Sequence, residues 1–287
     1  MTGNPSHANQ KAEEARNLLD QLLQDSKIYY RGKDYKDLLD FVVRLRNFAP
    51  FNAMLLNIQK PGLSYAASRP DWWHKFRRYP KEDARPLIIL WPFGPVALVY
   101  DVQDTEGLEL PEDAFSFPAE GDMSLEKFTA YTARCEAKGI TCKMVDKGDK
   151  MAGLIRAVKR AVQKGDRPSY EIKINKNHKP SVRFNTLVHE LAHLYLGHLG
   201  KDISLKTPDR LNLNLLQREL EAESLAYLVC SRNGVKPRSH TYLAGYVENN
   251  LTIDDIDVYQ IMRAAGQVEN LLGLTEGKTG FAGSGKG

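Results

Sequence analysis

The segment NTLVHELAHLYLGH places two histidines, His189 and His193, four residues apart, with Glu190 directly after the first. On a helix, residues i and i+4 lie on one face one turn apart, so the two imidazoles can chelate a single ion. Glu190 is rotated about 100° from His189, where it can face a water activated by the ion without binding the ion itself. The spacing predicts a catalytic Zn²⁺ site with Glu190 as general base.

The third metal ligand cannot come from the same segment. The pattern HExxHxxGxxH, which supplies a third histidine, needs Gly at position 196 and His at position 199, and both positions hold Leu. A downstream segment, QRELEAESLAYLVC, is predicted to be a helix and carries Glu219, Glu221 and Glu223. One carboxylate from it would complete a site of two His and one Glu with an open fourth position. We expect the other two to lie on a solvated face.

The combination HELAHLYLGH followed by ExEAxxxA resembles the ImmA/IrrE family of zinc metallopeptidases. In that family the Glu directly before Ala is the third ligand, which the resemblance assigns to Glu221, before Ala222. Two family positions differ here, since the Asn is Glu223 and the Phe is Leu225, and Glu219 is therefore kept as the alternative ligand. The resemblance implies a zincin-like endopeptidase that cuts a protein, such as a helix-turn-helix repressor of phage-defence or mobile-element genes.

A second resemblance covers most of the chain. The segments YRGKDYKDLL, NFAPFNAMLLNIQKPG, YDVQDTEG and SHTYLAGYVENN are similar to parts of ArdC-type antirestriction proteins. Those proteins join an N-terminal module for single-stranded DNA to a comparable peptidase domain. This resemblance implies that single-stranded DNA binds or stimulates the protein. It also keeps an alternative open, a DNA-binding antirestriction or mobile-element protein whose metal site is structural or vestigial.

Residues 69–85 interleave basic and aromatic side chains. Cations neutralise phosphates and aromatic faces stack on unpaired bases, so this composition suits single-stranded nucleic acid. The candidate DNA-binding residues are Arg69, Trp72, Trp73, Lys75, Arg77 and Arg78. The equally physical alternative places the two tryptophans in the core and the cations on a solvated rim.

Composition limits the class of protein. The chain has 287 residues, enough to bury a core without a disulfide or metal staple, so a metal is expected to be catalytic. Its three cysteines lack CxxC spacing, which favours reduced, buried thiols. No signal-like or membrane-spanning apolar run is found, and we expect a cytoplasmic protein without a membrane partner. The first 100 residues carry 15 Lys and Arg against 10 Asp and Glu, so the basic excess is N-terminal.

The predicted fold is α+β: a mostly helical zincin-like domain with a small sheet, preceded by an α+β N-terminal domain. The predicted divisions are a disordered start at 1–10, an N-terminal domain at 11–120, a metallopeptidase domain at 121–276 and a flexible tail at 277–287. Helices are predicted at 11–30, 34–47, after Pro50, 124–138, 150–164, 181–199, 211–232, 239–249 and 254–272. Strands are predicted in a hairpin of LIILW and PVALVYDV, and at 140–145 and 169–174. The last strand is expected to be the edge on which a peptide substrate pairs.

Overall fold

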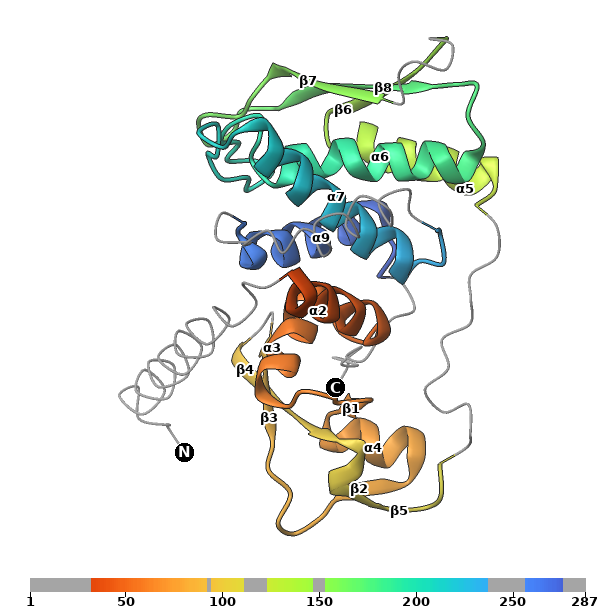
Figure 1. Ribbon diagram of the computed structural model, residues 1–287, viewed down its shortest axis with the longest axis vertical. Coiled ribbons are helices and arrows are strands. Elements are labelled where there is room, and N and C mark those ends of the chain that lie inside the picture. Colours follow the sequence, from red (N-terminus) through yellow and green to blue (C-terminus); the bar gives the residue numbers. More distant parts are fainter. Residues whose placement is uncertain (1–31, 92–93, 111–122, 147–152, 237–255, 276–287) are drawn as a thin grey trace.

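The computed structural model describes residues 32–91, 94–110, 123–146, 153–236 and 256–275. Its elements form a stack, with a three-stranded sheet at one end, helices in the middle and small β elements at the other end (Figure 1). The predicted α+β class is confirmed. The helices predicted at 11–30 and 239–249, and both predicted terminal segments, lie outside the described residues.

The N-terminal half opens with two helices, α2 (Gly32–Arg44) and α3 (Pro50–Gln59). Pro50 stands in the first turn of α3, where its missing N–H has no partner to lose. The predicted hairpin is confirmed as β3 (Leu87–Trp91) and β4 (Gly94–Asp101), which pair antiparallel. A short strand, β1 (Ala66–Ala67), pairs with the other side of β4.

A smaller unit follows at the lower end of the stack. Helix α4 (Arg69–Phe76) begins at Ser68, whose side chain caps it, and ends at Arg77 in the left-handed conformation. The next residues form β2 (Arg78–Pro80), which pairs antiparallel with β5 (Thr105–Gly107) after the short helix η2 (Val102–Asp104). Strand β5 lies outside the segments predicted to be strands.

The C-terminal half begins with α5 (Leu125–Glu136) and a three-stranded sheet in the order β6-β8-β7. Strands β6 (Ile140–Val145) and β8 (Ser169–Asn175) are parallel, and both were predicted. Strand β7 (Gly153–Lys159) pairs antiparallel with β8. Helices α5 and α6 (Pro180–Tyr195) cover one face of this sheet (Figure 1).

The prediction of a helix at 150–164 is wrong, because this segment contains β7. Within the strand Ile155 is buried, whereas Leu154, Arg156, Ala157 and Val158 are exposed, as fits a strand at the edge of the sheet. The Arg, Ala and Lys residues of the segment favour helix locally, but pairing with β8 overrides that weak preference.

The predicted substrate edge is also wrong. Strand β8 lies between β6 and β7, so both of its edges are already paired. The free edges of this sheet, among the described residues, belong to β6 and β7. A peptide that extends the sheet must therefore pair with one of these two strands.

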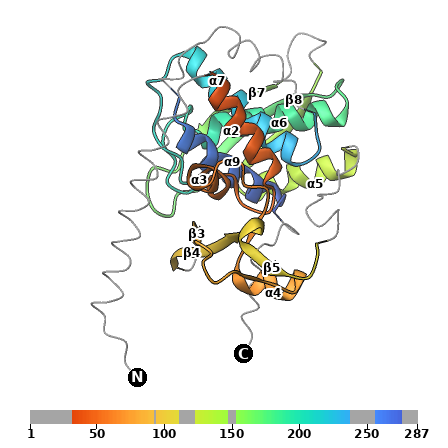
Figure 2. The ribbon, with the colours of Figure 1, turned by 60° about the horizontal axis from the view of Figure 1, so that its bottom comes forward.

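Helices α6, α7 (Leu215–Arg232) and α9 (Val258–Leu272) form the centre of the molecule. A capping box between Asn214 and Gln217 fixes the start of α7, and Gly273 in the left-handed conformation ends α9. One continuous hydrophobic core runs through these helices, the sheet, α2 and α3. The division at residue 120 stays a prediction, although α2 and α3 pack on the C-terminal helices (Figure 2).

Within the described part of the chain, the helices are too short or too polar to cross a bilayer.

Candidate metal centre

The structure brings both predicted histidines together with two acids of α7, Glu219 and also Glu223, whose Oε1 lies 3.3 Å from His189 Nδ1. The Nε2 atoms of His189 and His193 lie 3.1 Å apart on α6. Glu219 reaches them from α7, with carboxylate oxygens 3.5 Å from His189 Nε2 and 3.6 Å from His193 Nε2. Among the described residues, these three side chains form the group whose ligand atoms lie within 4.8 Å of one another. The acid that faces both histidines is therefore Glu219, the alternative ligand of the sequence prediction.

Glu221, the ligand that the resemblance assigned, points elsewhere. Residues two apart on a helix project on nearly opposite sides, so Glu219 and Glu221 cannot face the same ion. Glu221 is fully buried, and its oxygens accept hydrogen bonds from Arg210, His198 and the backbone N–H of Asp257. These donors occupy both oxygens and leave none to turn toward α6. In the structure, the acid that lies beside both histidines is therefore Glu219, the alternative ligand, and not Glu221.

Protonation shows why this cluster suits a cation. Burial opposes charge on His189, but Glu219 and Glu223 raise its pKa to about 10. Burial and the charge of His189 lower the pKa of His193 to about 3. The two Nε2 atoms face one another at 3.1 Å with the carboxylate of Glu219 beside them. Two nitrogens bound at about 2.0 Å in a tetrahedral zinc site lie roughly 3.3 Å apart, so the donor set fits zinc.

Glu190 lies on the side of α6 that faces β7. Its carboxylate is mostly buried and accepts a hydrogen bond from the backbone N–H of Ile155. Burial raises the pKa of Glu190 to about 7, close to the value expected of a general base at neutral pH. The charges of His189 and Glu219 act on the same carboxyl, which places Glu190 beside the cluster.

Gly153 allows β7 to lie this close to α6. A Cβ at this position would lie 2.4 Å from Thr186 Cγ2 and 2.9 Å from Glu190 Oε1, too close for any side chain to fit without displacing one of them. The sequence prediction left out Gly153 and Ile155 because their segment was expected to be a helix. The available signal for a strand was the isolated Gly153 inside an otherwise periodic segment.

His198 and Arg210 were also missed as parts of the site. His198 Nδ1 lies 3.0 Å from His193 Nδ1, and its Nε2 lies 3.0 Å from Glu221 Oε2. Arg210 binds both oxygens of Glu221 at 2.6 Å. Their separation in sequence from the acidic helix left no spacing signal, so packing alone reveals them.

The candidate DNA-binding residues divide into two groups. Trp72 is fully buried, donates its Nε1–H to the carbonyl of Tyr100 and packs edge-on against Tyr65. It therefore belongs to the core and has no face to offer a base. Arg78 is committed to the backbone, because it donates hydrogen bonds to the carbonyls of Thr105 and Leu108.

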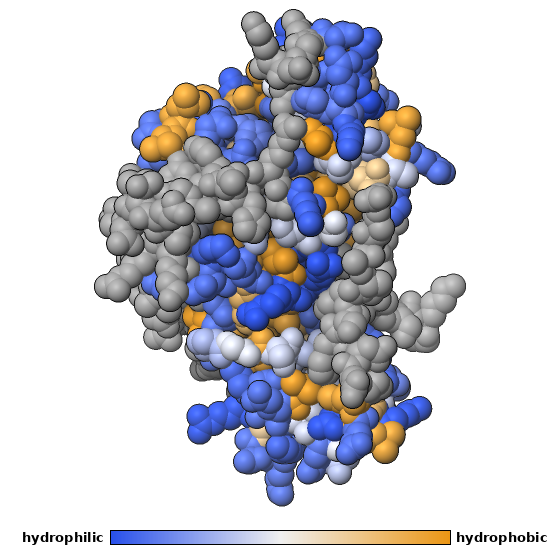
Figure 3. Space-filling view, turned by 45° about the vertical axis from the view of Figure 1, so that its right-hand side comes forward, coloured by the Kyte–Doolittle hydropathy of each residue, from blue (hydrophilic) through white to orange (hydrophobic). Residues whose placement is uncertain are grey.

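The other four stay at the surface. Trp73 is 50% exposed, and the guanidinium of Arg77 lies over its ring, 5.3 Å from the centroid. Lys75 is exposed and pairs with Asp71 at 3.2 Å, and Arg69 is exposed at the start of α4. This end of the molecule is largely hydrophilic, with a few apolar side chains among the polar ones (Figure 3). It lies far from α6 along the stack (Figure 1).

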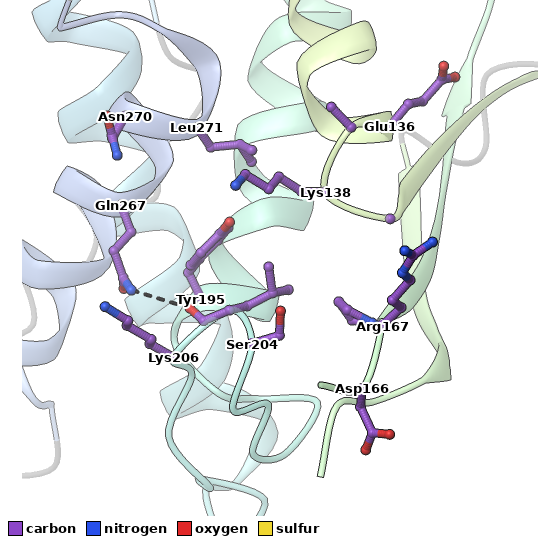
Figure 4. A pocket seen from close by; sticks show the side chains of 14 residues that line it. Glu136, Lys138, Asp166, Arg167, Tyr195, Ser204, Lys206, Gln267, Asn270 and Leu271 are labelled. Carbon is purple, nitrogen blue, oxygen red and sulfur yellow. Dashed lines mark hydrogen bonds between the residues drawn. The ribbon is translucent and has the colours of Figure 1, made fainter. Parts of the chain in front are cut away.

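A separate cavity of about 690 Å³ lies on another side of α6 (Figure 4). Tyr195 lines it with Gln267 of α9, and Lys138 and Lys206 stand at its rim. Lys138 directly follows the end of α5, where a cation offsets the negative end of the helix dipole. None of the three metal-site ligands lines this cavity.

Comparisons with known proteins give little. No protein-family model matches the chain, and no curated protein matches it. The chain is similar to a solved structure described as the crystal structure of antirestriction ArdC protein from R388 plasmid, in a metal-free form. That similarity has a TM-score of 0.34 and 17% identity and covers 79% of this chain and 83% of the other. A likeness this weak carries no argument about the function of this chain.

Proposed function

We propose that the protein is a zinc-dependent peptidase in which His189, His193 and Glu219 hold the metal. The observation that carries this proposal is the convergence of these three donors beside the buried carboxyl of Glu190. Three protein ligands leave the fourth position of a tetrahedral ion open, as catalytic zinc requires. Bound zinc would supply Lewis acidity to the scissile carbonyl and lower the pKa of water.

The chain's own residues perform the proton transfers. Glu190 takes a proton from the attacking water and passes it to the leaving amine, which is the general acid-base role its raised pKa suits. The Ile155 N–H holds one side of this carboxylate in place from β7. A peptide that extends the sheet along β7 would then lie next to Glu190.

Metal content and cleavage test this proposal separately. The purified protein is expected to contain about one zinc per chain. His193→Ala and Glu219→Ala should lose the metal, since each removes a direct ligand. Glu190→Gln should keep the zinc and lose cleavage. Full zinc content in His193→Ala would show that the metal, if present, binds elsewhere.

The proposal that a peptide substrate pairs with β7 can be tested separately. A photo-crosslinking residue at Val158 on β7 should capture substrate in the inactive Glu190→Gln protein. The matched control is the same residue at Met144 on β6, an exposed apolar position on the opposite edge of the sheet. Equal capture at both positions would argue against docking on β7.

The substrate class is taken from the resemblance to ImmA/IrrE peptidases. It implies a protein, such as a helix-turn-helix repressor that controls phage-defence or mobile-element genes. Co-expression with the product of the neighbouring gene should give a cleavage fragment in the wild type and none with Glu190→Gln. Cleavage that persists with Glu190→Gln would indicate a contaminating protease.

A second candidate function is binding of single-stranded DNA, with the metal site structural. The half-exposed Trp73 with Arg77 over its ring favours it, because an exposed aromatic face beside a cation suits a stacked base. Trp73→Ala should weaken oligonucleotide binding by about 1 to 3 kcal/mol. Arg77→Glu should weaken it further and reduce its salt dependence.

Fluorescence anisotropy at low salt measures this binding. Arg78 and Trp72 are unsuitable probes because both hold the fold. A wild-type protein that binds zinc but no single strand would remove this candidate. Binding without Glu190-dependent cleavage would instead favour it over the peptidase.

A further inference from the structure

A line of hydrogen bonds runs from the metal site into the core. It begins at His193 Nδ1, which lies 3.0 Å from His198 Nδ1. It continues from His198 Nε2 to Glu221 Oε2 at 3.0 Å and ends at Arg210, which binds both Glu221 oxygens at 2.6 Å. His198 and Glu221 are 3% and 0% exposed, so water does not compete for these contacts.

The charge state at the inner end is fixed. The Arg210 guanidinium donates to both oxygens of Glu221 at 2.6 Å, a bidentate pairing in which the carboxylate is ionised, and the N–H of Asp257 donates to Oε1. An ionised carboxylate can only accept hydrogen bonds. The ring atom that faces it, His198 Nε2, must therefore carry a proton.

This proton determines the next contact. His198 can serve the site only as a neutral ring with one N–H, because a second N–H, on Nδ1, would donate to His193 Nδ1 and leave the proton of His193 on Nε2. With that N–H directed at Glu221, His198 Nδ1 is left as an acceptor. The atom 3.0 Å away, His193 Nδ1, must then be the donor. The remaining nitrogen of His193, Nε2, keeps its lone pair, and it is the atom that faces His189 and Glu219.

We propose that His198, Glu221 and Arg210 act as positioning residues that hold His193 in the tautomer able to bind the metal. The inference rests on the proposed zinc site and assigns Glu221 a role at the inner end of this line rather than in contact with the ion. Metal-binding histidines commonly donate their other N–H to an acceptor, and loss of that acceptor typically lowers metal affinity 10- to 100-fold. Here the acceptor that contacts His193 is His198, and His198 in turn is held by the buried carboxylate of Glu221.

A purely structural role makes a different prediction. Arg210 and Glu221 also join the segment before α7 to the start of α9, since Glu221 accepts from the N–H of Asp257. If that were their whole role, His198 substitutions would change stability and leave the zinc dissociation constant unchanged. The two readouts must therefore be measured on the same variants.

Zinc affinity by chelator competition tests the proposal. His198→Leu removes both the donor and the acceptor and should raise the zinc Kd about 10- to 100-fold. His198→Gln offers a carbonyl to His193 and an N–H to Glu221 and should restore the Kd to within about threefold of wild type. Glu269→Gln is the matched control, because it alters a buried carboxylate of α9 that binds Arg232 at the other end of α7, and its Kd should stay unchanged.

The outcomes separate this inference from the proposed function. A wild-type protein that binds no zinc refutes both. Zinc that is lost in His193→Ala but bound equally well by wild type and His198→Leu refutes the positioning role alone. If His198→Leu does not fold, ¹⁵N NMR of the histidine-labelled, zinc-loaded wild type decides the matter. It should show protonated Nδ1 on His193 and protonated Nε2 on His198, and the opposite tautomer of His198 would overturn the proposal.

Discussion

Helix α7 buries a charged side chain near each end, and the two differ in what they contact. Glu221 near its start is enclosed by Arg210 and His198, and His198 touches a metal-site histidine. Arg232 at its end is enclosed by Glu269 and by backbone carbonyls between α2 and α3. Both are almost fully buried and saturated with partners. Burial of a charge is therefore common to both clusters, and the Glu221 cluster differs in its contact with a histidine of the candidate metal site.

The two clusters also connect different parts of the molecule. Arg232 donates to the carbonyls of Val42 and Phe48 at 2.6 and 2.7 Å, so it ties the N-terminal helices to the C-terminal ones. The Glu221 cluster stays within the C-terminal half and adjoins α6. We therefore expect damage at Arg232 to unfold the protein, and damage at Glu221 to weaken its metal binding as well.

The largest expected effect is that of Arg232→Met. It leaves the buried Glu269 carboxylate without its cation and removes four hydrogen bonds to backbone carbonyls, so the free energy of unfolding should fall by about 3 to 5 kcal/mol. Urea denaturation measures this loss. Zinc bound per folded chain should not change. A loss below about 1 kcal/mol would mean that the cluster does not hold the two halves together.

A double substitution sharpens the comparison. Replacing both members of a buried pair with apolar residues is often nearly neutral, so Arg232→Met with Glu269→Leu should recover about 2 kcal/mol of the loss. The same treatment of the other cluster, Arg210→Met with Glu221→Leu, should recover stability without restoring zinc affinity. If stability and zinc affinity both recovered in that variant, the Glu221 cluster would have a purely structural role, like the Arg232 cluster.

A smaller effect is expected midway along α7. The hydroxyl of Tyr227 donates to Asp40 Oδ1 of α2 at 2.6 Å. Tyr227→Phe keeps the ring and removes this hydrogen bond, which should cost about 1 kcal/mol of unfolding free energy. Thermal denaturation with zinc titration would check it. A change in zinc affinity would show that the two ends of α7 are coupled.

The smallest effect concerns Glu171, which lies on the outer face of the sheet and forms ion pairs with Lys143 and Arg156. The hydrogen bond from Lys143 is the main cause that lowers its pKa. A depressed pKa adds stability above the unfolded value, about 4.3, which is lost as pH falls through the folded value. Glu171→Gln should therefore be less stable than wild type at pH 7 and equal to it at acid pH. A constant difference across that range would contradict the ion pairing.

The sequence by itself determined the elements whose local signals agree with their environment. Strands at 140–145 and 169–174 are rich in β-branched residues and form as predicted. The HELAH spacing fixed His189 and His193 on one face of α6, because helical geometry alone sets the relation of i to i+4. Helix α3 likewise ends just before Pro61 and Gly62, two residues that do not continue a helix.

Tertiary structure decided what local geometry leaves open. The segment 153–159 is a strand because β8 pairs with it, although its residues also permit a helix. Glu219 and Glu221 have the same chemistry, but the packing of α7 on α6 sets which side of α7 faces the imidazoles. Trp72 and Trp73 are adjacent and identical, yet β4 covers the first and leaves the second exposed. In each case the residue type limits which interactions are possible. Which of them forms depends on the strand or helix that packs against the residue in the folded protein.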